Sequence, residues 1–369
     1  SLISIMFALQ LSAQGPQVVI PAPAEVMTSQ GTYRYMKNPK VRMLRDDTLP
    51  SEAYRLAIHQ RRGVTISFSD ESGRDYALHT LNQMTADGTV HELQCCEIYD
   101  YPRFAYRGLH VDVSRHFRSL DFLKKQIDAM AMFKMNRMHI HLTDAAGWRL
   151  QIDAYPRLTQ FAAWRPQHTW KEWWAGDRHY AEEGSKGAYG GYYTKEEIRD
   201  LVSYARARHI EIIPEIEMPS HSEEVLAAYP ELGCSGEAYK GSDFCMGNEE
   251  VFNFLETVLD EVMEIFPSEY IHIGGDEAGK QHWKTCPKCQ QRMKDEGMTE
   301  VDELQSYMIR RIERFVNSKG RRIIGWDEIL DGGLAPDATV MSWRGTEGGI
   351  KAMEQGHDVI MSPGRYCYL

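Results

Sequence analysis

The sequence has no basic stripe, no apolar run of membrane-spanning length at its start and no dinucleotide-binding motif, and each absence excludes a class of protein. The formal net charge of -11 would repel phosphate backbones and anionic lipids. The opening apolar run, Leu2–Leu11, is too short to cross a bilayer. No G-x-G-x-x-G follows an early predicted strand, which argues against a dinucleotide-dependent enzyme. We therefore expect no nucleic-acid partner and no membrane span.

The first residues are typical of what remains of a signal peptide. The apolar run Leu2–Leu11 is followed by the small and polar stretch Ser12–Gly15, as around a cleavage site. We therefore expect residues 1–14 to be a signal-peptide remnant and the mature protein to be periplasmic or secreted. An N-terminus that is disordered or partly buried, in a cytoplasmic protein, is the alternative.

The seven cysteines do not form a complete metal-binding pattern along the sequence. Cys286 and Cys289 make one C-x-x-C, but no second pair of that kind completes a four-ligand set, so we expect no metal and no cofactor. Cys234 and Cys245 flank a glycine-rich loop and are placed to close a disulfide. Because the total is odd, at least one thiol should stay unpaired.

Two different spacings of apolar residues divide the rest of the 369-residue chain into two predicted domains. Within residues 15–102, Gly63–Ser69 alternates like a strand and Asp75–Met84 has helical spacing, which predicts a small α+β domain. Within residues 103–369, short apolar strands alternate with helices of a dozen or more residues. That alternation predicts a parallel α/β sheet of the TIM (β/α)8 type.

Seven strands are predicted for the second domain, one fewer than a closed barrel needs. The strands are Gly108–Val113, Arg137–Thr143, Ile210–Glu217, Tyr270–Gly274, Arg322–Trp326, Thr339–Trp343 and His357–Met361. The helices are Leu120–Phe133, Thr194–Arg208, Glu249–Phe266, Val301–Ser318 and Glu347–Gln355, with a capping box at Thr194–Glu197. We therefore expect a barrel truncated after about the seventh strand, with an open edge.

Titratable and aromatic side chains gather where the predicted strands end, which is where TIM-barrel chemistry lies. Carboxylates among aromatic rings indicate a sugar pocket, because glycosidic cleavage needs an acid for the leaving oxygen and a group that stabilises an oxocarbenium-like centre. Asp276 and Glu277 follow Gly274 and Gly275. Neighbours on a regular strand face opposite ways, but the paired glycines let the backbone depart so that both acids face one pocket. An ordinary solvated loop is the alternative.

Five segments, in order along nearly the whole chain, resemble the family 20 glycoside hydrolases, the β-N-acetylhexosaminidases. They are Arg107–Phe117, His141–Arg149, Pro214–Ser222, His272–Glu277 and Gly325–Leu330. Ala145, Ala146 and Ser220 depart from the usual residues of those motifs. The resemblance implies retaining hydrolysis in which the substrate's own 2-acetamido carbonyl attacks the anomeric carbon, so that no protein nucleophile is needed.

The same resemblance implies a role for each candidate residue. Glu277 would act as general acid and then as base, and Asp276 would orient the acetamido group and stabilise the charge on its nitrogen. Asp144 and His221 would form a relay that tunes the proton affinity of Glu277. Arg107 would hold the O3 and O4 hydroxyls. The remaining predicted substrate-binding residues are Trp326, Trp343, Tyr368, His141 and Glu217.

The sequence thus predicts an exo-acting β-N-acetylhexosaminidase that removes terminal non-reducing N-acetylglucosamine or N-acetylgalactosamine from glycans. A glycan would be its partner. One alternative is a catalytically impaired sugar-binding homologue or fragment. Another is an enzyme of the same fold that releases a disaccharide.

Overall fold

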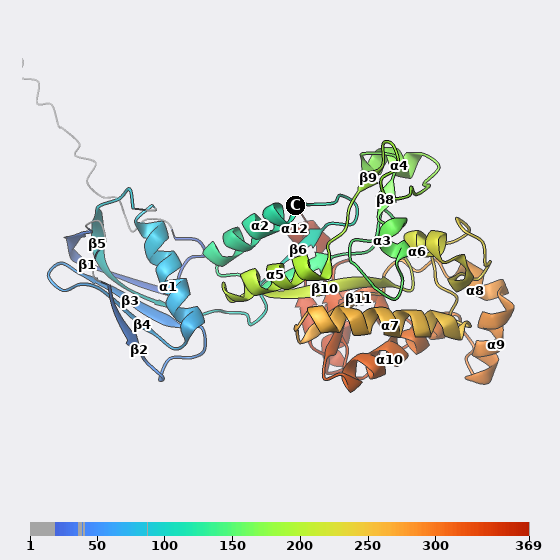
Figure 1. Ribbon diagram of the computed structural model, residues 1–369. Helices are drawn as coiled ribbons and strands as arrows, with labels where there is room; N and C mark the ends of the chain where they lie inside the picture. The colour runs from blue at the N-terminus through green and yellow to red at the C-terminus, as the bar shows by residue number, and fades with distance from the viewer. Residues whose placement is uncertain (1–18, 36–38, 40, 87, 369) are drawn as a thin grey trace, which may run out of the picture. The chain divides into compact units, whose positions relative to one another are not determined.

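The computed structural model describes residues 19–35, 39, 41–86 and 88–368, which form two compact units (Figure 1). The first unit holds the described residues up to Arg107 together with Asp128–Asn136, and the second holds Gly108–Ile127 and the chain from Arg137 onward. The predicted signal-peptide remnant, residues 1–14, lies outside the described residues.

The first unit is a mixed five-stranded sheet with one helix packed on it, which confirms the predicted α+β class. The elements are β1 (Glu25–Arg34), β2 (Val41–Arg45), β3 (Tyr54–His59), β4 (Gly63–Phe68), α1 (Glu71–Met84) and β5 (Glu92–Asp100), with the strand order β1-β5-β3-β4-β2. Only the β2–β4 pairing is parallel among those described. Leu56, Ile58 and Ile66 alternate along β3 and β4 and bury against Leu81 of α1.

The second unit is built on seven parallel strands in the order β14-β13-β12-β11-β10-β7-β6. They are β6 (Gly108–Asp112), β7 (Arg137–His141), β10 (Glu211–Met218), β11 (Tyr270–Gly274), β12 (Arg322–Trp326), β13 (Thr339–Ser342) and β14 (Val359–Met361). The predicted α/β half-barrel is therefore confirmed. Within the described residues β6 and β14 are the two edges and do not pair with each other.

Helices connect these strands and cover the outer face of the sheet. The long helices are α2 (Leu120–Met132), α5 (Lys195–Arg206), α7 (Glu249–Ile265), α10 (Asp302–Ser318) and α11 (Glu347–Glu354). Helices α7 and α10 lie side by side (Figure 1). The predicted capping box is present, since the Thr194 side chain accepts from the Glu197 N–H and Glu197 accepts from the Thr194 N–H. None of the described helices is long and apolar enough to cross a membrane.

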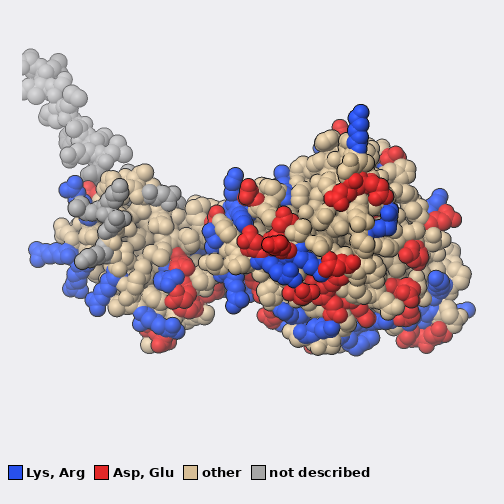
Figure 2. All heavy atoms as spheres, viewed as in Figure 1, with Lys and Arg blue, Asp and Glu red and all other residues tan. Residues whose placement is uncertain are grey.

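The central strands of the second unit are buried on both faces because helices cover one side and side chains of the barrel interior cover the other. Ile212, Ile213, Ile271 and Ile323 are almost fully buried for this reason. Acidic and basic side chains are interspersed over the visible face of this unit, which carries no continuous basic stripe (Figure 2).

Several short elements were not predicted, and they lie near the carboxyl ends of the strands (Figure 1). They are α3 (Arg157–Gln160), β8 (Trp164–Arg165), α4 (Trp170–Ala175), β9 (Tyr189–Gly190), α6 (Glu223–Ala228), α8 (Gln281–Thr285), α9 (Pro287–Asp295) and α12 (Gly364–Cys367). The connection from Trp148 to Tyr193, predicted as a substrate loop, holds four of them.

Candidate active site

The backbone after β11 turns sharply and brings two carboxylates to one histidine. Gly274 and Gly275 have φ angles of 65° and 97°, and Glu277 has a φ of 50°. A Cβ atom on Gly274 would lie 1.9 Å from the Glu217 Oε2 atom. The predicted departure from regular strand geometry is therefore present, and it requires glycine at position 274.

The histidine is His221, which lies between three carboxylates. Its Nε2 atom is 3.4 Å from Asp276 Oδ2 and 3.4 Å from Glu277 Oε2, and its Nδ1 atom is 3.3 Å from Asp144 Oδ1. Burial lowers the pKa of His221, but the carboxylates of Asp144 and Asp276 outweigh burial and raise the pKa well above its usual value. His221 is therefore a cation at neutral pH. The structure brings the four predicted catalytic residues together.

A second buried carboxylate, Glu215 of β10, forms the floor beneath this group. It is fully buried and accepts hydrogen bonds from His141 Nδ1 at 2.6 Å and Trp326 Nε1 at 2.8 Å. His139 and His272 also place ring nitrogens within 3.1 Å of its oxygens. Burial raises the pKa of Glu215, but the surrounding histidines hold it well below its usual value. Glu215 has no role of its own among the sequence-based predictions, although the motif Pro214–Ser222 contains it.

His141 and Trp326 therefore bind the buried Glu215 carboxylate. His141 is fully buried and also lies 3.0 Å from Asp144 Oδ2. Burial lowers its pKa, but Glu215 and Asp144 outweigh burial and raise the pKa to about 10. Trp326 is 6% exposed, so its ring is mostly enclosed by protein.

Glu217 differs from the other buried carboxylates because it accepts no hydrogen bond from the residues that the structure describes, although the His141 Nδ1 atom lies 3.7 Å from its Oε1 atom. Its side chain is almost fully buried. Burial, and then the negative charges of Asp276 and Glu215, raise the pKa of Glu217 well above its usual value. Burial and these neighbouring charges therefore favour the uncharged form of Glu217.

The structure does not support the prediction that Arg107 binds sugar hydroxyls. The Arg107 guanidinium belongs to the first unit, where it donates to Glu52 Oε1 at 2.9 Å, to Tyr76 at 3.1 Å and to the Lys134 carbonyl at 2.8 Å. It also donates to the Phe104 carbonyl at 2.8 Å. A side chain with all its donor groups engaged in this way holds a fold together.

Arg115, eight residues further along the same motif, lies at the predicted catalytic group instead. Its guanidinium is 2.5 Å from Asp144 Oδ2 and 3.0 Å from Asp112 Oδ2. The Asp112 carboxylate also accepts from the Arg115 backbone N–H at 2.9 Å, which fixes the turn after β6. The motif contains two arginines, and only the fold distinguishes them.

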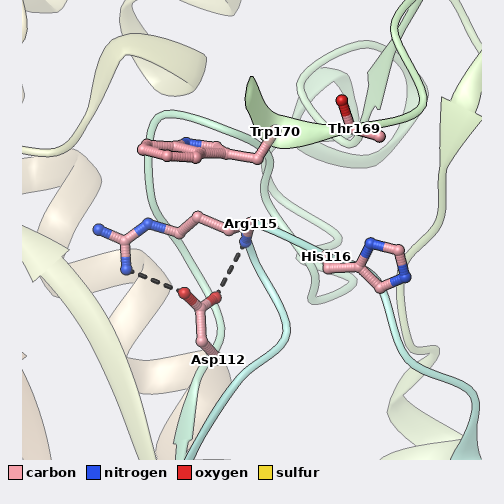
Figure 3. A pocket seen from close by; sticks show the side chains of 5 residues that line it. All are labelled: Asp112, Arg115, His116, Thr169 and Trp170. Carbon is pink, nitrogen blue, oxygen red and sulfur yellow. Dashed lines mark hydrogen bonds and ion pairs between the residues drawn. The ribbon is translucent and has the colours of Figure 1, made fainter. Parts of the chain in front are cut away.

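A cavity of about 370 Å³ opens beside Arg115 (Figure 3). Its lining residues are Asp112, Arg115, His116, Thr169 and Trp170. The Trp170 indole lies over the Arg115 side chain, whereas His116 points away from the other side chains drawn (Figure 3). The volume is within the range of small-ligand sites, and a flat ring over a charged group suits a sugar, which has both apolar faces and hydroxyls.

Two aromatic rings lie near the end of the described chain. The Trp343 and Tyr368 rings are nearly parallel, with centroids 6.4 Å apart and an interplanar angle of 16°. Trp343 Nε1 donates to Glu328 Oε2 at 3.0 Å. Burial, and then the charge of Asp276, raise the pKa of Tyr368 to about 12, so its hydroxyl keeps its proton and can donate.

A parallel half-barrel with paired acids at the ends of its strands is an arrangement that carboxylate-dependent glycoside hydrolases use. The profile described as glycosyl hydrolase family 20, catalytic domain, matches residues 104–369, and that described as domain 2 of the same family matches residues 32–101. The chain belongs to glycosyl hydrolase family 20.

Individual relatives agree with this membership. A β-hexosaminidase of Porphyromonas gingivalis is 45% identical over 340 residues, which cover 86% of this chain and 41% of that protein. A β-hexosaminidase of Akkermansia muciniphila is 33% identical, and the match covers all of this chain and 74% of that protein. The crystal structure of a family 20 exo-β-N-acetylglucosaminidase from Vibrio harveyi, in complex with N-acetylglucosamine, superposes with a TM-score of 0.85 at 29% identity, covering 95% of this chain and 61% of that one.

Proposed function

We propose that the protein is an exo-acting β-N-acetylhexosaminidase that hydrolyses terminal non-reducing N-acetylglucosamine or N-acetylgalactosamine from glycans with retention of configuration. The observation that carries the proposal is the Asp276 carboxylate. Its Oδ2 atom faces His221, while its Oδ1 atom is buried and accepts no hydrogen bond from the described residues. A buried acceptor without a partner is suited to an N–H group that the substrate supplies, such as that of a 2-acetamido group.

The proposed chemistry follows from this pairing. Asp276 holds the acetamido group so that its carbonyl oxygen attacks the anomeric carbon, and it stabilises the positive charge that develops on the acetamido nitrogen. Glu277 protonates the leaving oxygen and then takes a proton from the water that opens the cyclic intermediate. The Glu277 side chain is 58% exposed, which suits a group that must meet aglycones of many shapes.

The His221 cation and Asp144 support this chemistry without touching the sugar. The cation at 3.4 Å stabilises the Glu277 carboxylate after proton donation, and Asp144 fixes the orientation of the imidazole. We assign to Arg115 the hydroxyl-binding role that the family resemblance implied for Arg107. Binding the terminal hydroxyls at Arg115 would leave no room for a further sugar on that side, which favours exo cleavage.

The test compares two substrates that differ only in the acetamido group. We expect 4-nitrophenyl N-acetyl-β-glucosaminide to be hydrolysed with a kcat/KM on the order of 10⁴-fold above that of 4-nitrophenyl β-glucoside. A thiazoline analogue of the cyclised sugar should inhibit competitively. Similar rates on the two substrates would exclude acetamido participation, and release of disaccharides from longer glycans would favour the disaccharide-releasing alternative.

The sugar-binding alternative is separated from the enzyme by the same assay. A protein that binds N-acetylglucosamine by calorimetry but shows no turnover of the chromogenic substrate would be an impaired homologue. We also propose export from the cytoplasm, on the basis of the opening Leu2–Leu11 segment. Recovery of the full-length protein in the cytoplasmic fraction only, with its N-terminus unprocessed, would contradict export.

A further inference from the structure

Four of the seven cysteines meet at one point in the second unit. Cys234 and Cys245 lie in the loop between α6 and α7, and Cys286 and Cys289 lie at the start of α9. Their four sulfur atoms all lie within 4.8 Å of one another. Cys234 and Cys245 therefore complete a set of four possible ligands without C-x-x-C spacing, which corrects the expectation that no such set is present.

The sulfur–sulfur distances are those of a tetrahedral metal site. Cys245 Sγ lies 3.6 Å from Cys286 Sγ and 3.7 Å from Cys289 Sγ, and Cys234 Sγ lies 3.7 Å from Cys289 Sγ. Four thiolates around one zinc ion, each with a Zn–S bond of about 2.3 Å, have neighbouring sulfurs about 3.8 Å apart. A disulfide joins one sulfur to one other sulfur, but the Cys245 Sγ atom lies at nearly the same distance from those of Cys286 and Cys289. The predicted Cys234–Cys245 bridge is therefore not favoured.

The backbone around the sulfurs is built for this close approach. An antiparallel bridge between Gly233 and Phe244, with the Cys245 N–H donating to the Leu232 carbonyl at 2.8 Å, brings the first two cysteines side by side. The second two lie on the first turn of α9, where the backbone N–H groups favour negative charge.

A glycine marks the point at which the two segments meet. A Cβ atom on Gly247 would lie 2.0 Å from the Lys288 carbonyl carbon and 2.3 Å from the Cys289 nitrogen. The chain therefore needs glycine two residues after Cys245 for its loop to lie against the turn that carries Cys289. Three of the four cysteines are at most 6% exposed, as for a closed structural metal site.

We propose that Cys234, Cys245, Cys286 and Cys289 bind one zinc ion as a structural tetrathiolate site. Two other groups of potential ligands share Glu215, namely His110 with His139 and His141 with Glu217. Glu215 already accepts from ring nitrogens of His141 and Trp326, so those groups belong to the floor of the active site. The sulfur site has four soft ligands in the geometry that zinc takes.

The zinc site would join the loop before α7 to the segment that follows the catalytic acids. Asp243, two residues before Cys245, accepts from the Lys280 N–H at 2.9 Å, three residues after Glu277. Trp283 Nε1 donates to the Phe244 carbonyl at 2.9 Å in the same region. Fixing Cys245 to Cys286 and Cys289 would therefore hold the backbone on which Glu277 is placed.

The experiment measures metal directly on the purified chain. Elemental analysis should find about one zinc per chain, and native and denaturing mass spectra should differ by one zinc ion. The variants Cys245→Ser and Cys289→Ser should lose the metal, whereas Cys367→Ser, an exposed cysteine outside the cluster, should keep it. Replacement of zinc by cobalt(II) should give the visible absorption of a tetrahedral tetrathiolate, which reports the site even when a serine variant does not fold.

Three results would overturn the proposal. They are four free thiols that take up neither zinc nor cobalt, a denatured mass lower by four hydrogens that reveals two disulfides, and a coloured iron centre in place of zinc. The metal measurement does not depend on hydrolysis, so a chain that binds zinc but fails to cleave N-acetylglucosaminides would contradict only the proposed function.

Discussion

The two units of the molecule each bury a group of charged side chains, but only one of these groups is fully partnered. In the first unit the Lys134 ammonium donates to Asp100 Oδ2 at 2.7 Å and to the Tyr54 hydroxyl at 2.9 Å. Arg107 and Glu52 form a second pair with the Tyr76 hydroxyl. Each ion there has an opposite charge beside it, which is how a buried charge becomes tolerable.

The group at the ends of the barrel strands differs because it holds polar atoms that no neighbour satisfies. Both oxygens of Glu217 and the Oδ1 atom of Asp276 accept no hydrogen bond from the described residues. A buried polar atom without a partner costs about 1–3 kcal/mol, so the fold keeps it only where something else compensates. A substrate supplies such compensation, whereas a purely structural cluster must satisfy itself.

The largest expected effect is that of a substitution at Glu277, the most exposed of the four catalytic residues. Glu277→Gln removes the proton donor, so kcat/KM on glycans with poor leaving groups should fall by about 10³-fold. A 2,4-dinitrophenyl glycoside needs little protonation and should lose far less. The measurement is the kcat/KM of variant and wild type on both substrates.

The control for that experiment is Glu354→Gln, at an exposed glutamate that ends α11. It should change neither rate. Equal losses on activated and unactivated substrates for Glu277→Gln would contradict proton donation and make Glu277 a binding group.

The next effect tests the unpartnered oxygen of Asp276. Asp276→Asn keeps the shape but removes the charge that would face the acetamido nitrogen, so kcat should fall by about 10²–10³-fold on both kinds of leaving group. Binding of the thiazoline analogue should weaken in parallel. A near-normal kcat in Asp276→Asn would take this residue out of the mechanism.

A pair of arginine variants tests the comparison between the units directly. Arg115→Gln should lower kcat/KM by about 10–100-fold, through lost charge-assisted hydrogen bonds to the sugar, with little change in melting temperature. Arg107→Gln should do the reverse, destabilising the first unit by about 1–2 kcal/mol while kcat/KM is kept. Steady-state kinetics and thermal unfolding of both variants decide the matter, and an Arg107 variant with a raised KM but normal stability would restore the sequence-based assignment.

Much of the fold could be predicted because its strands are buried on both faces. Short segments with few polar residues, such as Tyr270–Gly274 and Arg322–Trp326, have the predicted bounds. The short helices α3, α4, α8 and α9 were missed because four to nine residues give too little periodicity to detect. A signal was nonetheless present at α4, where Thr169 and Glu172 form a capping box.

A residue of the site could be predicted from the sequence only where the residues next to it determine its local backbone conformation. Gly274 and Gly275 before two acids indicated a turn, and the turn is there. Arg107 and Arg115 share one motif, and no local pattern tells which of them reaches the carboxylates, because that depends on the strand and turn between them. The cysteine cluster depends in the same way on a contact between positions 234 and 289, which are far apart in the sequence.

The smallest expected effect concerns Glu217 and is seen in stability against pH. Because its folded pKa lies well above the usual value near 4.5, folding takes up a proton there, and the stability it contributes is lost as pH rises from about 4.5 through the folded pKa. Glu217→Gln is neutral at every pH and removes this dependence. Urea unfolding should therefore be measured at several pH values. The free energy of unfolding of the variant should rise relative to that of the wild type as pH rises, by at most about 1.4 kcal/mol per pH unit. Parallel curves would mean that Glu217 is ionised and has a cationic partner, so that the two buried clusters would no longer differ at this residue.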